Sequence, residues 1–242
     1  MTKTIKPGQS IDLKNVDAVL KELKKHASKK ALETRKHFGI HIENSFGLTT
    51  PQLRQIAKQI GPNHELALQL WGTGNHEARH IASLIAVPAQ TGEDLMEQWL
   101  NDFNAWDIVD GCCSSLFRKT PLAYVKAMEW TSREKEFEKR AGFTMMAQLA
   151  VHDKKAPDSQ MEEFFIPIIR ESADPRNFVR KAVNWALRQI GKRNERLCLK
   201  TITVARKIHQ KNDATSKWIA ADALRELEKY LAGGRIKNIG TR

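Results

Sequence analysis

Apolar residues recur at spacings of three and four along almost the whole chain, and alternation of apolar and polar positions is nearly absent. The first pattern is that of an α-helix with one buried face, whereas a half-buried strand needs alternation. The chain of 242 residues is therefore expected to be all-α. The expected helices cover 15–29, 30–38, 51–60, 63–71, 76–87, 92–103, 105–118, 121–130, 134–152, 159–173, 175–190, 194–209 and 215–231.

Capping residues at the ends of these segments support the assignment. Thr49-Thr50-Pro51 is typical of a capped helix start with a first-turn proline, and Asp174-Pro175 is expected to open another helix that Gly191 closes. About a dozen short helices with short connections predict HEAT-like pairs, stacked into a curved α-solenoid with a concave basic groove. A compact helical bundle is the alternative, because no strict sequence period is visible.

One domain over residues 1–242 is expected, with flexible ends at 1–14 and 233–242. The segment 152–158 resembles a linker but is too short to separate independent domains. No apolar run is long enough to span a membrane, and residues 1–17 lack the apolar core of a signal peptide. A cytoplasmic protein, nucleoid-associated if bacterial, is expected, with no membrane partner. Cys112, Cys113 and Cys198 have neither disulfide nor metal-ligand spacing and are expected to be buried, reduced thiols.

The net charge of +12 is unevenly spread. Residues 1–36 hold 10 Lys and Arg against 4 acids, residues 37–175 hold 13 against 19, and residues 176–242 hold 17 against 5. Basic ends suit a polyanion such as DNA, because Lys and Arg at phosphates release counterions. A solvated basic surface is the alternative, which charge alone does not exclude.

The motif HEARH at 76–80 matches the two-histidine helical signature of zinc proteases. A structural interpretation is favoured, in which Asn75 caps a helix and Glu77 lies in its first turn, where the helix dipole favours an acid. No metal is expected here. The expected buried stripe of this helix is Ala78, Ile81, Ala82 and Ile85.

Trp106 and Asp110 lie four residues apart in NAWDIVDGCCSSLF, on one face of a mostly apolar helix. Asn104 and Asp107 can form a reciprocal cap, which gives Asp107 a structural role. Asp110 has no such role, and a carboxylate beside an indole needs a cationic partner. Two interpretations of Asp110 are therefore open. It is either a catalytic carboxylate or a core residue bonded to an Arg or to a helix end.

Two further segments carry candidate binding residues. In 174–191, Lys181, Trp185 and Arg188 gather away from the apolar stripe of Val179, Val183, Ala186 and Ile190. Cations beside an indole suit a nucleic acid, and packing of a half-buried Trp is the alternative. Arg140, the last cation before a long apolar run, could reach a phosphate or pair with Asp110.

These segments resemble the AlkD-like family of DNA alkylation repair glycosylases over most of the chain. The similar stretches are FGLTTPQLRQIAK (46–58), NHEARHIA (75–82), AWDIVD (105–110), KRAGF (139–143) and FVRKAVNWALRQIGK (178–192), of which the last two are the most specific. Asn184 differs, because many relatives carry Gly before the tryptophan.

The resemblance implies a HEAT-like solenoid that holds duplex DNA and excises cationic alkylpurines such as 3-methyladenine and 7-methylguanine, acting as a monomer without metal or cofactor. It implies that Asp110 is the catalytic carboxylate. It further implies that Trp106 and Trp185 are aromatic walls at the deoxyribose and Arg140 a phosphate clamp. Lys181, Arg188 and Arg180, in the same matching helix, would contact the DNA.

Three function classes are carried forward, and a fourth, a metalloprotease, is set aside unless the protein binds a zinc ion. A DNA glycosylase for alkylated bases in double-stranded DNA is expected first. A noncatalytic helical-repeat protein that binds structured or branched DNA is the alternative, since the same basic surface would serve it. A protein-binding scaffold is the third, and its sign would be indifference to DNA and to salt.

Overall fold

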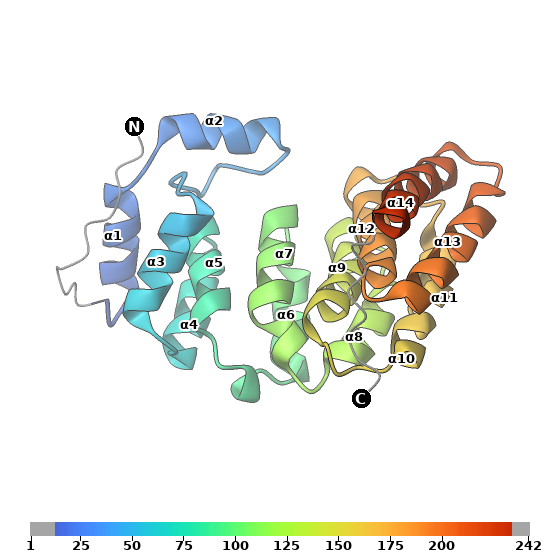
Figure 1. Cartoon of the computed structure of the whole chain (residues 1–242). Coiled ribbons are helices and arrows are strands. Elements are labelled where there is room, and N and C mark those ends of the chain that lie inside the picture. Colours follow the sequence, from blue (N-terminus) through green and yellow to red (C-terminus); the bar gives the residue numbers. More distant parts are fainter. Residues whose placement is uncertain (1–12, 234–242) are drawn as a thin grey trace. The chain divides into compact units, whose positions relative to one another are not determined.

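The computed structural model describes residues 13–233, in which every regular element is a helix and no strand occurs (Figure 1). The predicted all-α fold is thereby confirmed. Residues 1–12 and 234–242, where most of the expected flexible ends lie, are outside the described part. Leu13, which was grouped with the flexible N-terminal end, is buried in the core.

The chain divides into two compact units, one ending at Thr120 and the other beginning at Pro121. The first unit contains α1 (Val16–Lys25), α2 (Lys29–His37), α3 (Thr50–Ile60), α4 (His64–Gly72), α5 (His76–Ile85), η1 (Pro88–Gln90), α6 (Glu93–Asn101), α7 (Trp106–Ser115) and η2 (Phe117–Lys119). The second contains α8 (Ala123–Trp130), α9 (Glu136–His152), α10 (Asp158–Glu163), α11 (Phe165–Glu171), α12 (Asn177–Gly191), α13 (Glu195–His209) and α14 (Ala214–Ala232).

Several expected helix boundaries were wrong. The first helix, expected over 15–29, ends at Lys25. The single helix expected over 159–173 is two helices, α10 and α11, which meet at Phe164. Pro167 explains the break, because it has no N–H to donate to the carbonyl of Glu163, four residues earlier. Helix α12 begins at Asn177, two residues after Pro175, and Asp174 instead accepts hydrogen bonds from the backbone and guanidinium of Arg176.

Other predicted helix starts are confirmed. Helix α3 begins after Thr49, whose backbone N–H donates to the Gln52 side chain at 2.9 Å, and a proline lies in its first turn. Asn75 caps α5 by accepting from the Ala78 N–H at 3.0 Å. The predicted apolar stripe of α5 is buried.

The first unit is built around aromatic packing between neighbouring helices. The rings of Trp71 in α4 and Trp99 in α6 stack with centroids 4.0 Å apart, and the Trp71 indole N–H donates to Asp102 at 2.8 Å. Arg79 of α5 lies over the Trp71 ring at 5.1 Å. Burial of large aromatic rings with a satisfied polar edge fixes α4, α5 and α6 in one arrangement.

Helix α9 is the central element of the second unit. It packs between α8 and α12, and nearly every side chain from Arg140 to Ala150 is buried. Gly142 lets α8 come close: a Cβ at this position would lie 2.7 Å from the backbone N of Thr131 and 3.0 Å from the carbonyl of Ala127. The close approach of α8 and α9 therefore depends on a residue without a side chain.

Glu77 is the polar centre of the first unit. Its fully buried carboxylate accepts hydrogen bonds from the backbone N–H groups of Phe46 (2.9 Å), Gly47 (2.8 Å) and Leu48 (3.1 Å) and pairs with Arg35. The segment between α2 and α3 is thus tied to α5 through one side chain. Glu77 lies in the first turn of α5, as predicted, and its carboxylate has the additional role of bonding to another segment, which was not predicted.

We predict that Gly142→Ala destabilises the protein by about 1–3 kcal/mol, because the new methyl group meets backbone atoms of α8 that cannot move aside. Gly72→Ala is the matched control, since a Cβ there has nothing within 4 Å. The control should be neutral or stabilising by up to about 1 kcal/mol. Urea unfolding of both variants measures the difference, and equal stabilities would contradict the close-packing account.

We predict that Glu77→Gln lowers the free energy of unfolding by about 3–5 kcal/mol at pH 7, because it leaves the largely buried Arg35 side chain without its counter-charge. Burial would raise the pKa of Glu77, but Arg35 and the N–H groups of Phe46 and Leu48 outweigh burial and hold the pKa below its usual range. A depressed carboxyl pKa stabilises the folded state above the unfolded pKa and loses that effect as pH falls.

The difference in the free energy of unfolding between the wild type and Glu77→Gln should therefore become smaller as pH falls below about 4. Urea unfolding across pH 3–7 measures it. Glu65→Gln, at an exposed acid in the first turn of α4, is the control and should change stability little. A difference independent of pH would show that the Glu77 charge does not stabilise the fold.

Candidate functional site

Helix α7 of the first unit presents Trp106 and Asp110 on one face. Trp106 is the first residue of the helix and Asp110 follows one turn later, and both side chains are partly exposed. The Trp106 indole N–H donates to the carbonyl of Phe38 at 3.1 Å, which fixes the ring at the end of α2. The opposite face, with Ile108 and Cys112, is buried. An indole and a carboxylate are therefore accessible together on this helix.

Asp107, on the adjacent face of α7, contacts two histidines of α5. Its Oδ2 atom lies 2.9 Å from Nε2 of His76 and 3.3 Å from Nε2 of His80. The expected Asn104–Asp107 cap was wrong: the N-cap residue is Ala105, and no side chain caps this helix. Asp107 instead joins α7 to α5.

The protonation states in this cluster follow from burial and hydrogen bonding. Burial alone would raise the pKa of Asp107, but the hydrogen bonds from His76 and His80 outweigh it and hold the pKa well below its usual range. Burial lowers the pKa of His76, although the Asp107 carboxylate favours its charged form. Because an ionised carboxylate only accepts, both Nε2 atoms donate to it.

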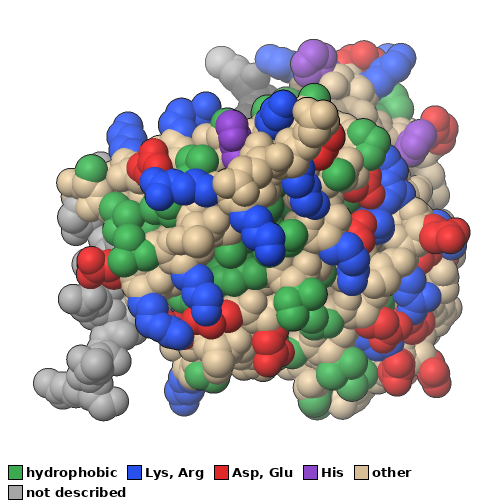
Figure 2. Space-filling view, turned by 90° about the vertical axis from the view of Figure 1, so that its right-hand side faces the viewer, with side chains coloured by type: hydrophobic (Ala, Val, Ile, Leu, Met, Phe, Trp, Pro, Cys, Tyr) green, Lys and Arg blue, Asp and Glu red, His purple; other side chains and the backbone are tan. Residues whose placement is uncertain are grey.

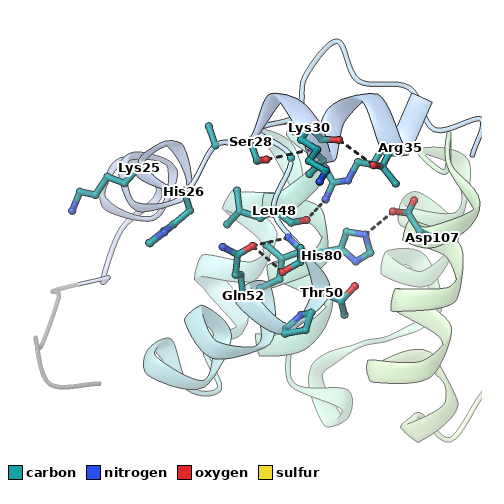
Figure 3. A pocket seen from close by; sticks show the side chains of 17 residues that line it. Lys25, His26, Ser28, Lys30, Arg35, Leu48, Thr50, Gln52, His80 and Asp107 are labelled. Carbon is teal, nitrogen blue, oxygen red and sulfur yellow. Dashed lines mark hydrogen bonds and ion pairs between the residues drawn. The ribbon is translucent and has the colours of Figure 1, made fainter. Parts of the chain in front are cut away.

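A cavity of about 810 Å³ lies beside this cluster in the first unit. Figure 3 shows His80 and Asp107 directed toward each other at its wall, near Arg35. The other polar side chains of the lining are mostly basic or hydroxyl groups: Lys25, His26, Ser28, Lys30, Thr34, Thr49, Thr50 and Gln52. The lining suits a ligand that carries oxygen atoms.

The remaining predicted site residues lie in the second unit. Arg140 of α9 is buried, with 6% of its surface exposed, and its guanidinium donates to the carbonyl of Phe178 at 2.7 Å. Phe178 lies in the first turn of α12, so Arg140 supports the start of the helix that carries the other candidates.

On α12, the predicted separation of faces is confirmed. The apolar stripe is buried, Trp185 and Arg188 are half-buried, and Lys181 is exposed. The Trp185 indole N–H lies 3.2 Å from the Gln189 side-chain oxygen, in the amide orientation that satisfies both groups. Arg180 lies over the ring of Trp218 in α14 at 5.1 Å.

Acidic side chains neutralise part of the basic C-terminal segment. Arg188 pairs with Glu226 and lies 3.6 Å from Asp222, both in α14. Arg196 of α13 pairs with Asp158 at 2.9 Å and with Glu162 of α10 at 2.8 Å. Figure 2 shows Asp and Glu side chains interspersed among Lys and Arg on the side of the molecule at the right of Figure 1.

Several contacts were not predicted from the sequence. The helical spacing of His76 and His80 is visible in the sequence. Their common partner, Asp107, is 31 residues from His76 and 27 residues from His80, so this contact is not. The Asn184 amide, at the position that departs from the family pattern, is buried and donates to the carbonyl of Ile219 at 3.1 Å. The cysteines are free and buried, as predicted.

No helix in residues 13–233 is both long and apolar enough to cross a membrane. The chain matches the protein-family model described as "DNA alkylation repair enzyme" over residues 19–227. No curated protein matches it.

One similar solved structure is described as "A new family of proteins related to the HEAT-like repeat DNA glycosylases with affinity for branched DNA structures". The TM-score is 0.77 at 21% sequence identity, over 92% of this chain and 96% of that chain. This likeness confirms the predicted HEAT-like helical-repeat fold. Because the family model spans most of the sequence, the chain belongs to the family of DNA alkylation repair enzymes.

Proposed function

We propose that the protein is a DNA glycosylase that hydrolyses the N-glycosidic bond of cationic alkylpurines, 3-methyladenine and 7-methylguanine, in double-stranded DNA. The observation that carries the proposal is the partial exposure of Trp106 and Asp110 on one face of α7. Both residues lie in AWDIVD (105–110), one of the stretches that resemble the AlkD-like glycosylases.

The chemistry suits a carboxylate beside an indole. A cationic base is already a good leaving group, so bond cleavage needs stabilisation of an oxocarbenium-like sugar more than strong acid catalysis. The bond from the base nitrogen to the sugar carbon breaks, and its electron pair neutralises the base. Asp110 places negative charge where positive charge develops. A water then adds to the sugar carbon and gives its proton to the Asp110 carboxylate, which releases it to solvent, and hydrolysis is complete. The indole of Trp106 adds a cation–π interaction.

The second unit supplies the proposed DNA contacts. Lys181 is exposed on α12 and is the most accessible of the predicted phosphate contacts, with Arg180 and Arg188 beside it. Arg188 must exchange Glu226 for a phosphate, which costs part of the binding energy. Trp185 is proposed as the second aromatic wall and Arg140 as the phosphate clamp at the start of α12.

A noncatalytic protein that binds branched DNA is the second candidate. The specific observation for it is the similar fold of a protein whose family is described as having affinity for branched DNA structures. A basic surface that contacts phosphates serves both functions, because phosphate contacts carry no sequence information. Base release is what separates the two proposals.

We predict that the purified protein releases free alkylpurine from methylated duplex DNA and that Asp110→Asn lowers the rate by about a hundredfold or more, because the amide removes the opposing charge. DNA binding should be retained in the variant. Asp94→Asn is the matched control, at an exposed acid in the first turn of α6, and should release base at the wild-type rate.

Equal release by the wild type and Asp110→Asn would remove Asp110 from the mechanism. If neither protein releases base but a four-way DNA junction is bound more tightly than a linear duplex, the branched-DNA function is favoured instead.

We also predict that Lys181→Ala weakens duplex DNA binding and lowers the slope of log affinity against log salt concentration by about 1, because one phosphate contact is lost. Lys200→Ala removes the same charge from α13, where that lysine pairs with Glu162, and should leave the slope unchanged. Fluorescence anisotropy at several salt concentrations measures both. An unchanged slope in Lys181→Ala would exclude this lysine from the DNA interface.

A further inference from the structure

The cluster of His76, His80 and Asp107 has a property that the proposed glycosylase does not use. One ligand-type atom from each residue lies within 4.8 Å of the other two. The two imidazoles come from successive turns of α5, and the carboxylate comes from α7. We propose that these three side chains bind one divalent transition-metal ion, with Zn²⁺ the best match, and leave an open coordination position toward the adjacent cavity.

The ligand set and spacing support this proposal. Two imidazoles and one carboxylate are the protein ligands of many open zinc sites and of two-histidine, one-carboxylate iron sites. Metal–ligand bonds of about 2.0–2.1 Å in a tetrahedral site put the ligand atoms about 3.4 Å apart. The Asp107 oxygen is already 2.9 Å from the His76 nitrogen and 3.3 Å from the His80 nitrogen. Small side-chain rotations would admit an ion.

The surroundings of the cluster fix two of the ligands. The second oxygen of Asp107 accepts from the backbone N–H of Ile108 at 3.0 Å, which orients the carboxylate as outer hydrogen bonds do in metal sites. Gly111 of α7 leaves room for the His80 ring, since a Cβ there would lie 2.9 Å from its Nδ1 atom. The ring of His80 is thereby held against α7.

Access and charge are also compatible with a metal ion. The side chains of His76, His80 and Asp107 are 6%, 13% and 19% exposed, so the ligands are shielded but not sealed. His80 and Asp107 line the cavity, which provides an entry path and space for a water or another oxygen ligand. Arg35 is the nearby fixed cation, and its charge is balanced by Glu77.

The test uses the full chain, stripped of metal with a chelator, titrated with Zn²⁺ by calorimetry and with Co²⁺ by visible spectroscopy. We expect one ion per chain, a tetrahedral Co²⁺ spectrum without a thiolate charge-transfer band, and a Zn²⁺-dependent rise in melting temperature. His80→Gln should weaken Zn²⁺ binding by more than about a hundredfold. His41→Gln, at an exposed histidine, should bind as the wild type does.

Gly111→Ala is a second variant that keeps all three ligands and displaces the His80 ring, and we expect Zn²⁺ binding about tenfold weaker. Circular dichroism of the metal-free variants shows whether each has folded. Equal affinity in His80→Gln and wild type, a thiolate band from a cysteine, or no Zn²⁺ binding by the folded wild type would each overturn the proposal. None of these readouts depends on DNA or on base release, so the glycosylase proposal stands or fails separately.

Discussion

The arrangement of the first unit depends on one buried carboxylate. Glu77 accepts three backbone hydrogen bonds from residues 46–48 and balances the charge of Arg35, so α2, α3 and α5 are held together at one point. A buried charge is tolerated only when such partners satisfy it. Helix α5 then presents His76 and His80 to Asp107 of α7. The start of α7, which carries the candidate catalytic residues, is therefore positioned by polar contacts as well as by apolar packing.

In the second unit, cationic side chains likewise hold neighbouring helices together. Arg140 bonds to a backbone carbonyl of α12, and Arg188 pairs with acids of α14. Arg188 and Arg196 show that part of the basic excess of the C-terminal segment stabilises helix packing, which the count of charges did not indicate. Exposed lysines such as Lys181 are better placed to contact a polyanion, because no internal ion pair must be broken first.

Local patterns predicted the helices well and the contacts between them poorly. Apolar spacing and caps at Thr49 and Asn75 depend on residues within one turn, so they are readable from the sequence. The partners of Glu77 and Asp107 come from distant segments, and no local pattern identifies them. Asp107 was expected to cap its own helix and instead bonds to α5. Most of the candidate site residues stood out from spacing and residue type, but their roles came from the resemblance to a family. Spacing alone did not decide whether Asp110 is a core residue or a catalytic one.

The most direct test of the central claim compares release of a cationic and a neutral lesion from otherwise identical duplexes, 7-methylguanine against 8-oxoguanine. A site that stabilises charge at the sugar without strong acid catalysis needs a leaving group that is already cationic. Release of 7-methylguanine with no detectable release of 8-oxoguanine is the predicted result. Comparable release of both lesions, or release of neither by protein that binds both duplexes, would contradict the account.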